Sequence, residues 1–342
     1  MRFVAGARIG SGVVSAALTA VACGAVPVLF AQQPARSLPP ATSVAVPRTP
    51  DGHPDFQGLW TNGTATPLLR PQEFANKPTL TPEEAAAFEK GSLGRLLEDI
   101  PEADRVTAAD LNDIYLDTHS LKLVDGRRTS LIVDPPDGRL PLPLPQAKSR
   151  SAARPKRSFD DPETLTLDER CLLSTVDGTS NASPPMVPNQ YAQNFYEIVQ
   201  TRGQLMIYTE VVHDARVIRI GGTHPPPTVQ FWLGDSVGHW EGDTLVVDTT
   251  NFTPKSHFRG SSERLHVVER FTRPDANTIG YRATVDDPDT WARSWTADIP
   301  FKRSTDRIFE YACHEGNYSL ENGMRGARAE EKEKAAHKTG GR

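Results

Sequence analysis

The feature that most constrains the fold is a series of short segments rich in β-branched and aromatic residues between about residue 191 and residue 320. Turn-forming residues rather than helical patterns separate these segments, as in β-sandwiches and β-barrels. The predicted strands cover residues 196–200, 204–212, 215–220, 230–233, 237–240, 244–251, 265–272, 278–285, 294–301 and 308–313. The sequence therefore predicts a mainly β protein. A lipocalin-like antiparallel barrel and a sandwich both remain open, because periodicity does not separate them.

The first 31 residues are typical of an export signal. Arg2 and Arg8 give the start a positive charge, residues 13–31 carry none, and Ala31 ends a small-residue cleavage site. Roughly 19 apolar residues are also enough to span a bilayer, so a retained membrane anchor is the alternative. Lipidation at Cys23 is a further one. We expect cleavage after Ala31 and a periplasmic or secreted protein without membrane insertion.

Composition divides the remaining chain into four regions. They are residues 32–71, a proline-rich linker that ends in a docking segment; residues 72–190, an irregular and partly helical region packed on the β domain; residues 191–320, the antiparallel β domain; and residues 321–342, a polar tail. Polar composition of the tail favours a frayed helix followed by disorder.

Local signals predict a few elements before the β domain. Thr81, Pro82 and Glu84 combine a capping box with a proline at the first helical position, which predicts a helix from residue 81. The other expected elements are helices near residues 108–115 and 164–173, a strand at 129–133, an extended path at 141–145 and a basic loop at 149–157.

Net charge and cysteine content narrow the classes of partner. The formal charge is −5 and no basic stripe with interleaved aromatic residues is present, which argues against nucleic acid. Cys171 and Cys313 remain after the signal, and in an oxidising compartment they are candidates for a disulfide. Two free buried thiols are the alternative, because sequence spacing says nothing about distance. The oligomeric state stays open.

Several enzyme classes lack their sequence signatures. The chain has no phosphate-binding loop, no dinucleotide-binding fingerprint and no His-Glu-x-x-His zinc motif. Export also argues against a soluble nucleotide cofactor. The sequence thus predicts no cofactor, apart from one candidate site for a divalent metal.

The first candidate catalytic group lies at the end of the last predicted strand. Since side chains alternate along a strand, His314 shares a face with Glu310, and Glu315 shares one with Cys313. A neutral histidine beside a carboxylate suits a general base or a metal ligand. The alternative is a histidine that forms a hydrogen bond at the barrel rim next to a disulfide.

A second candidate group, Glu210, His213, Asp214 and Arg216, surrounds a tight turn between two predicted strands. If this turn lines the barrel lumen, His213 and Asp214 form an acid–base pair and Arg216 holds an anionic group. Glu210 would then have a raised pKa in apolar surroundings. The alternative is a charged hairpin that stays solvated.

The loop that carries Asp235, His239, Glu241 and Asp243 is a candidate metal site. Hard cations such as calcium take several carboxylate and carbonyl oxygens from a turning loop, and this loop has them. Its spacing differs from that of a known calcium loop, and a plain hairpin turn is the alternative.

Aromatic residues concentrated in the β region suit a pocket for a flat, apolar ligand. The candidates are Tyr208, Trp232, Trp240, Tyr281 and Trp295. Glu269 lies among apolar residues on its strand face, which marks either a functional acid or a carboxylate paired with an arginine. Packing of the aromatic residues in the core is the alternative.

Five sequence stretches resemble an uncharacterised group of exported proteins of soil bacteria. They are residues 50–60 (PDGHPDFQGLW), 130–139 (SLIVDPPDGR), 234–252 (GDSVGHWEGDTLVVDTTNF), 269–273 (ERFTR) and 311–318 (YACHEGNY). The resemblance implies export and a single co-folding unit, and it assigns no catalytic residue. The β region is also loosely similar to lipocalin-like barrels in architecture.

We therefore expect an exported protein that binds a small, partly apolar molecule in a β-barrel pocket. The alternative is an acid–base enzyme, such as a lyase, isomerase or hydrolase, that acts on a small molecule. It would use His314 with Glu310 or Glu315, assisted by the group at residues 210–216. A structural envelope protein without a pocket is the third interpretation.

Overall fold

The structure, a computed structural model, describes residues 46–98, 122–154, 156–173, 183–188, 194–256 and 258–340. The predicted export signal, residues 32–45 of the linker and the helix expected near residues 108–115 lie outside these residues. The described chain contains ten strands and three α-helices. None of these helices has both the length and the apolar character that crossing a membrane requires.

Most of the β structure lies in the second half of the chain, as predicted. The strands are β1 (Gly58–Thr61), β2 (Ile132–Asp134), β3 (Phe195–Gln200), β4 (Gln204–Thr209), β5 (Ala215–Ile220), β6 (Asp235–Glu241), β7 (Thr244–Thr250), β8 (His266–Asp275), β9 (Thr278–Asp286) and β10 (Trp295–Arg303). The helices are α1 (Pro82–Glu98), α3 (Pro145–Ala152) and α4 (Tyr318–Gly340). Short 3-10 helices include η4 (Val211–His213) and η5 (Phe258–Gly260).

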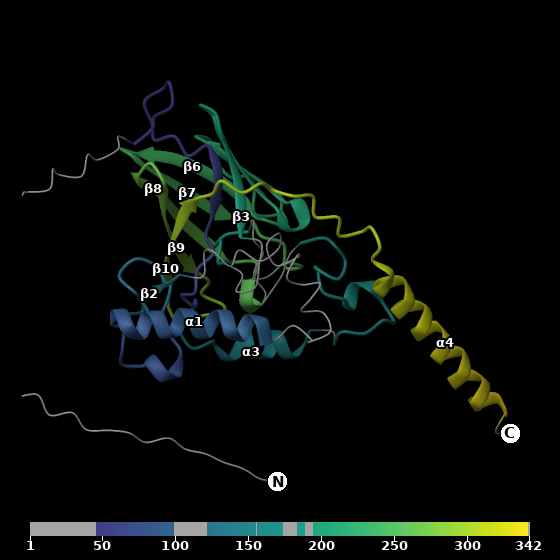
Figure 1. Cartoon of the computed structure of the whole chain (residues 1–342). Helices are drawn as coiled ribbons and strands as arrows, with labels where there is room; N and C mark the ends of the chain where they lie inside the picture. Colours follow the sequence, from purple (N-terminus) through teal and green to yellow (C-terminus); the bar gives the residue numbers. More distant parts are fainter. Residues whose placement is uncertain are drawn as a thin grey trace, which may run out of the picture. The chain divides into compact units, whose positions relative to one another are not determined.

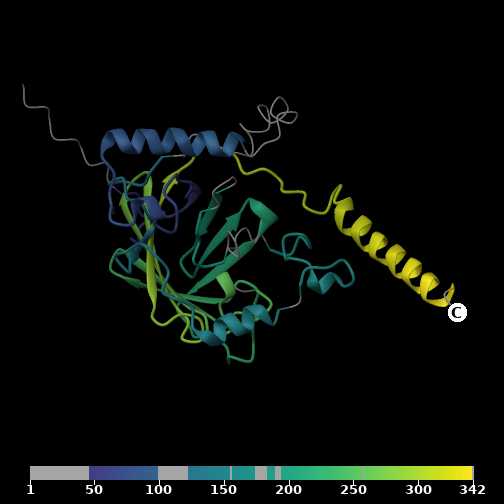
Figure 2. The ribbon, with the colours of Figure 1, turned by 90° about the horizontal axis from the view of Figure 1, so that it is seen from below.

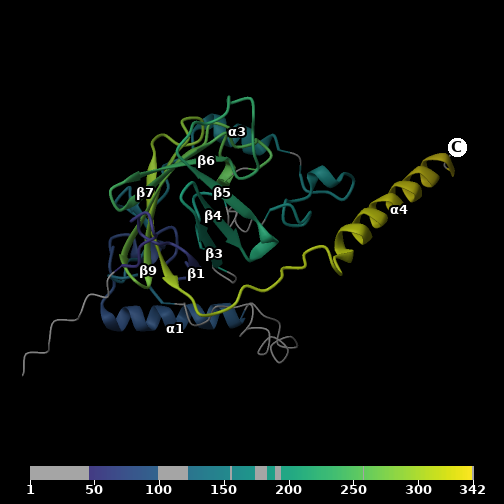
Figure 3. The same cartoon turned by 90° about the horizontal axis from the view of Figure 1, so that it is seen from above.

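Nine of the strands close into a barrel (Figures 1 and 3). The order runs from β1 through β3 to β10 in sequence, and β10 pairs back with β1. β2 pairs with the first part of β10, on the edge whose last part pairs with β1. The predicted mainly β fold is confirmed, and it is a barrel rather than a sandwich.

One neighbouring pair departs from the antiparallel pattern. β5 and β6 run parallel, so the chain must cross from one end of the barrel to the other between them. Residues 221–234 make this crossover. Since lipocalin barrels have eight strands in up-and-down order, the likeness to them stays one of general architecture.

Alternation in the sequence located most strands to within a few residues. Two predicted strands are wrong. Residues 230–233 lie in the crossover, where Phe231 forms only an isolated bridge with Phe252. Residues 308–313 form no strand, because β1 already occupies the edge of β10 that a further strand would need. Conversely, the sequence predicts a docking segment and no strand at β1, because this strand is short and begins at Gly58.

The region before the barrel also differs in part from expectation. The capping box is formed: Thr81 Oγ1 accepts from the Glu84 N–H, and Glu84 Oε2 accepts from the Thr81 N–H. The predicted helix at residues 164–173 is wrong, because Cys171 adopts a left-handed conformation (φ 53°) that ends a single turn. α3 replaces part of the predicted loop at residues 149–157.

The barrel has two distinct ends, which follow from the strand directions. One end carries the β3–β4, β6–β7 and β8–β9 hairpins, and we name it the hairpin end. The opposite end carries the β4–β5 turn and the loops at residues 251–265 and 287–294, of which residue 257 lies outside the described chain. We name this second end the mouth.

Every second side chain of β8, β9 and β10 points into the barrel. Phe271, Tyr281, Ile299 and Phe301 are fully buried there, and outward-facing neighbours such as Arg282 are exposed. Burial of a large apolar side chain contributes roughly 1.5–3 kcal/mol, so this aromatic interior is a main source of stability.

The hairpin end is closed by aromatic residues from the segment before β1. His53 stacks on Trp240 with ring centroids 4.2 Å apart, and Phe56 stacks on the same ring at 6.0 Å. Trp60 donates from Nε1 to the carbonyl of Phe56. The mouth is therefore the end of the barrel where a functional site is to be sought.

Helix α3 lies against the loops of the mouth, which Figure 2 shows from below. Arg150 in α3 donates to the carbonyl of Gly260 at 3.0 Å and to Thr290 Oγ1 at 2.7 Å. The helix thus holds the two loops together.

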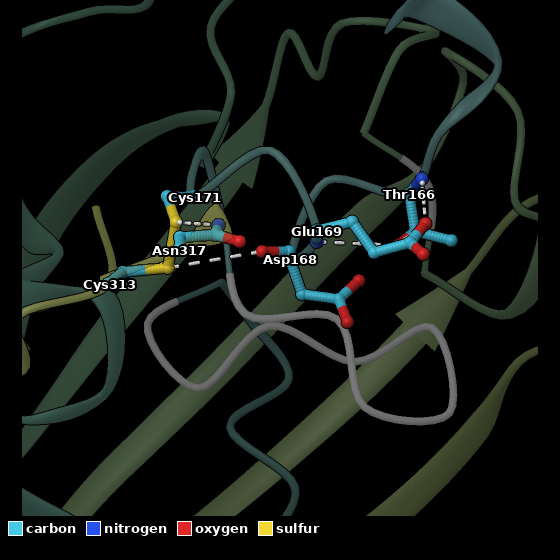
Figure 4. Close-up of a disulfide and its surroundings, with 6 residues drawn as sticks. All are labelled: Thr166, Asp168, Glu169, Cys171, Cys313 and Asn317. Atoms are coloured by element: carbon cyan, nitrogen blue, oxygen red, sulfur yellow. Dashed lines mark hydrogen bonds between the residues drawn. A yellow bond between two sulfur atoms is a disulfide. The ribbon is translucent and has the colours of Figure 1, made fainter. Parts of the chain in front are cut away.

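A disulfide joins the segment after β10 to the segment after α3 (Figure 4). Cys171 and Cys313 are bonded with their Cα atoms 5.7 Å apart, so the pairing that the sequence left open is present. Asn317 Nδ2 donates to Cys171 Sγ at 3.6 Å. The bond closes a loop with a sequence separation of 142 residues, which corresponds to about 5 kcal/mol in the chain-entropy account.

Candidate functional site

A short proline-rich segment, residues 183–188, reaches the barrel interior, and we name it the plug segment. Met186 is fully buried and Val187 is 3% exposed, and both belong to the core of the barrel. The Met186 N–H donates to Tyr281 Oη at 2.9 Å, and the Met186 carbonyl accepts from Asn62 Nδ2 at 3.0 Å. The plug segment therefore uses the backbone polar groups of one residue to bind inward-facing side chains.

Beneath the plug segment lies a buried polar network. Tyr281 Oη donates to Glu269 Oε1 at 2.9 Å, and Arg216 Nη1 donates to the same oxygen at 2.9 Å. Arg216 Nη2 pairs with Glu269 Oε2. Arg216 also donates to Ser236 Oγ and Thr249 Oγ1, each at 3.0 Å. All three nitrogens of the guanidinium group thus have an acceptor.

The network holds its geometry because each nitrogen of the Arg216 guanidinium group has a hydrogen-bond acceptor. The side chains of Arg216 and Glu269 are 2% and 0% exposed, so neither charge is solvated. Desolvation of such a pair costs several kcal/mol per ion, and only full hydrogen bonding offsets that cost. Burial, together with the Glu269 carboxylate, raises the pKa of Tyr281 well above its usual range, so the hydroxyl stays protonated.

The β4–β5 turn forms part of the rim of the mouth, and we name residues 210–214 the rim turn. Val212 and His213 adopt left-handed conformations with φ of 60° and 45°. Such a conformation is strained for a β-branched residue and tends to occur at functional sites. The turn is held by Thr209, whose N–H donates to the Asp214 carbonyl at 2.9 Å and whose hydroxyl donates to the Val211 carbonyl at 3.1 Å.

The rim turn carries one buried carboxylate, Glu210, and one part-buried carboxylate, Asp214. Glu210 Oε1 accepts from the backbone N–H of Phe309 at 2.9 Å, and Glu210 is 4% exposed. Glu210 Oε2 and Asp214 Oδ2 are buried without a hydrogen-bond partner among the described residues. Burial raises the pKa of Asp214 to about 7 and also raises the pKa of Glu210.

A cluster of charged side chains lies on the outward face of β6, β7 and β8, and we name it the outer histidine cluster. Arg219 pairs with Asp235 through two hydrogen bonds of 2.7 and 3.0 Å. His224 Nδ1 lies 2.6 Å from Asp235 Oδ2, and His224 Nε2 lies 3.1 Å from Asp248 Oδ1. His266 Nε2 lies 2.7 Å from Asp248 Oδ2.

The outer histidine cluster anchors the crossover at residues 221–234 to the sheet. Because both ring nitrogens of His224 face carboxylate oxygens, both hydrogen bonds require the doubly protonated ring. The hydrogen bond with Asp248 raises the pKa of His266, and the same bond lowers the pKa of Asp248.

The predicted catalytic residues lie in two groups, one in and beside the rim turn and one in the segment after β10. A single hydrogen bond, described below, joins the rim turn to that segment. Glu210 is buried and Asp214 is part-buried in the rim turn, Arg216 points inward to Glu269, and His213 is exposed. The other predicted residues, Glu310, His314 and Glu315, are exposed in a segment without strand structure. The bond from the Phe309 N–H to Glu210 brings this segment to the rim turn.

The predicted ligand-binding residues lie in three different places. Tyr281, Glu269 and Trp295 are fully buried in the interior. Trp240 packs at the hairpin end. Tyr208 is part-buried on the outward face of β4, and Trp232 is 39% exposed in the crossover. The structure thus joins Tyr281 and Glu269 in the polar network, whereas Trp295 packs against Phe258 and Trp291.

The predicted metal ligands do not converge. Asp235 pairs with Arg219, Asp243 pairs with Arg48, and Glu241 pairs with Arg270 and His239. In the part of the chain that the structure describes, no three histidine, cysteine or acidic side chains are arranged to hold a metal ion.

Sequence reasoning missed the plug segment and most of the outer histidine cluster. Met186 lies among prolines and has no strand periodicity, so no sequence signal pointed to its burial. Asp248 and His266 were recognisable as outward positions on predicted strands, opposite inward apolar neighbours. Residues 234–238 also match the pattern Gly-x-Ser-x-Gly of hydrolases. However, Ser236 lies within β6 rather than on a strand-to-helix turn, and it bonds Arg216 and Thr249.

Comparisons of the chain with protein-family models, with curated proteins and with solved structures gave no match. We therefore infer function from the geometry of the mouth.

Proposed function

We propose that the protein binds a small, partly apolar molecule at the mouth of the barrel, in the position that Met186 holds in the structure. The observation that carries this proposal is the site that Met186 occupies, which we name its seat. There the apolar side chain is buried in the core, the backbone N–H donates to Tyr281 Oη, and the backbone carbonyl accepts from Asn62 Nδ2. Ligand sites in proteins have this composition, with mostly apolar walls and a few fixed polar groups.

The seat is suited to an exchangeable occupant. Two hydrogen bonds hold Met186 to side chains of the barrel. A methionine side chain is unbranched and adaptable, so it fills space without a unique fit. A ligand that replaces it needs an apolar group, a donor for Tyr281 Oη and an acceptor for Asn62 Nδ2.

The buried network beneath the seat holds the Tyr281 hydroxyl in the same position when the occupant changes. Arg216 fixes Glu269, and Glu269 accepts from Tyr281, so the phenol oxygen keeps its lone pairs directed at the donor above it. Such preorganisation reduces the cost of binding.

We further propose that binding takes place outside the cytoplasm. The disulfide between Cys171 and Cys313 supports export, because disulfides persist mainly in oxidising compartments. The charged start and uncharged stretch of residues 1–31 support it as well.

A substitution pair tests the binding site. Met186→Ala removes the buried side chain from the seat and leaves an apolar cavity, whereas Met206→Ala changes a part-buried methionine on the outward face of β4. We expect Met186→Ala to lose about 2–5 kcal/mol of stability. N-benzylacetamide, which supplies an apolar ring, a donor and an acceptor, should then raise its melting temperature, since a ligand that binds only the folded state stabilises it.

The matched variant makes the result decisive. Met206→Ala should show no larger response to N-benzylacetamide than the wild type. Equal responses of the two variants at millimolar concentrations, or no response of Met186→Ala, would contradict the proposed site.

The rim turn favours one further candidate function, an acid–base enzyme. A carboxyl group with a pKa near the working pH is suited to accept and return a proton, and the pKa of Asp214 is about 7. If mass spectrometry of the natively purified protein identifies a bound molecule, Asp214→Asn should abolish its turnover and leave its binding in place. Unchanged turnover in this variant would exclude the enzymatic role of Asp214.

A further inference from the structure

The barrel contacts all three parts of one amino-acid residue in the plug segment. The N–H of Met186 donates to Tyr281 Oη at 2.9 Å, and the carbonyl of the same residue accepts from Asn62 Nδ2 at 3.0 Å. The side chain between these two groups is fully buried. The seat thus receives a donor, an apolar group and an acceptor in the arrangement that every apolar residue of a peptide has.

The residues beside Met186 need few further partners. Pro184, Pro185 and Val187 are buried, and Pro188 is part-buried. The three prolines have no backbone N–H, so they bring no donor into the barrel. The N–H of Val187 bonds the carbonyl of Pro185 at 2.9 Å. A peptide on the same path therefore avoids unpaired buried donors because prolines flank its central residues.

The side chains that bond Met186 are uncharged, and aromatic rings surround them. Asn62 is fully buried and also donates from Nδ2 to Tyr196 Oη at 3.2 Å. Tyr196 and Tyr281 both pack against Phe301, with centroid distances of 5.1 and 5.4 Å. Proline-rich peptides commonly bind to sites lined by aromatic side chains. Burial of a charged side chain here would be unfavourable, so the surroundings favour an uncharged occupant.

We infer that the seat of Met186 binds a short, uncharged peptide in which prolines flank an apolar residue, and that the plug segment is an internal copy of this ligand. The inference rests on the proposed function and names the ligand class of the same site. The plug segment is then a tethered competitor that a free peptide must displace. Since a tethered segment competes at an effective concentration of about millimolar, the wild type should bind a free peptide only weakly.

A peptide with the sequence of residues 183–188 (SPPMVP), acetylated and amidated at its ends, tests the inference. It is titrated into the full-length wild type and into Met186→Ala, and the dissociation constant is measured by calorimetry. Because Met186→Ala weakens the competing plug segment, this variant should bind the peptide about tenfold more tightly than the wild type does, or more. Met206→Ala, which changes an outward methionine of β4, should bind it like the wild type.

A second peptide tests the hydrogen bonds of the seat. It carries N-methylmethionine at the central position, so it lacks the N–H that Tyr281 accepts and keeps the apolar side chain. Met186→Ala should bind this peptide about tenfold more weakly than the unmodified one. When Met186→Ala also carries Tyr281→Phe, the two peptides should differ less in affinity, because the acceptor is gone. The comparison of the two peptides on Met186→Ala alone does not depend on the folding of this double variant.

Two results would overturn the peptide inference. Equal affinity of the wild type and Met186→Ala for the unmodified peptide would place the peptide outside the seat. Equal affinity of Met186→Ala for the two peptides would show that the N–H of the central residue plays no part in binding.

The proposed function fails by a different result. If N-benzylacetamide stabilises Met186→Ala but the unmodified peptide does not bind, only the peptide inference falls. If neither compound binds, both fall.

Discussion

Replacing Asp214 by Asn tests whether the rim turn holds an unfavourable buried charge. The pKa of Asp214 is about 7 in the folded protein against an ordinary value of 3.8, and burial is the cause. A carboxyl group with a raised pKa binds its proton more tightly in the folded than in the unfolded state. The free energy of unfolding of the wild type should therefore fall as the pH rises from about 4 to about 7.

The magnitude follows from the size of the shift. Between pH 5 and pH 8 about two pKa units of the shift are crossed, which corresponds to about 3 kcal/mol at roughly 1.4 kcal/mol per unit. Asp214→Asn cannot ionise, so it lacks this loss. At pH 5 its unpartnered amide should make it about 1–3 kcal/mol less stable than the wild type. By pH 8 the difference should have moved by about 3 kcal/mol in favour of the variant.

Urea denaturation of both proteins at pH 5, 6, 7 and 8 measures this difference directly, and the other ionisable groups cancel in the comparison. Glu197→Gln serves as the control and should stay within about 0.5 kcal/mol of the wild type at every pH. A difference between Asp214→Asn and wild type that does not change with pH would refute the reasoning. A change in the opposite direction would refute it as well.

Three further predictions concern the network, the outer cluster and the disulfide. Glu269→Gln should cost about 3–5 kcal/mol in urea denaturation, because it leaves a buried guanidinium without its counter-charge; a loss below 1 kcal/mol would contradict the buried pair. The bond with Asp248 raises the pKa of His266, so its stabilising effect is present at low pH and is lost as the pH rises through that pKa. His266→Asn should accordingly destabilise the protein more at pH 6 than at pH 9, and equal effects would count against the pair. Replacing Cys171 and Cys313 by Ser should lower stability by up to about 5 kcal/mol, and an unchanged melting temperature would show that the bond contributes nothing.

Strand content was predictable because alternation is a local property, whereas periodicity left the choice between a barrel and a sandwich open. In β10, Trp295, Ala297, Ile299 and Phe301 are buried in turn with exposed or part-buried neighbours, as the sequence pattern indicates. Glu269 was recognisable as a carboxylate on an apolar face for the same reason. Of the two interpretations of Glu269, pairing with an arginine holds in the structure, and the partner is Arg216.

The candidate site was harder to predict because it depends on contacts between distant parts of the chain. Met186 meets Tyr281 across 95 residues, and Asn62 meets Met186 across 124. No periodicity or spacing in the sequence encodes such a meeting. The predicted strand at residues 308–313 failed for a similar reason, since closure of the barrel by β1 removed the edge that it needed.

The rim turn could be predicted from the sequence only in part. Its residue types indicated charged chemistry at Glu210 and Asp214, but the direction of Arg216 could not be read from the sequence. Arg216 alternates with exposed Ala215 and Val217 on β5, and that register turns it into the barrel. Strand register therefore decided which charged residues of the turn remain at the rim.

Methyl NMR of methionine tests the central claim most directly. The chain has four methionines, of which Met186 lies in the seat, whereas Met206 and Met324 lie outside the core. On titration of the wild type with N-benzylacetamide, or with a molecule recovered from the native protein, the Met186 signal should shift as the side chain leaves the seat. The signals of Met206 and Met324 should stay in place. Binding that leaves the Met186 signal unmoved would contradict a ligand site at the mouth of the barrel.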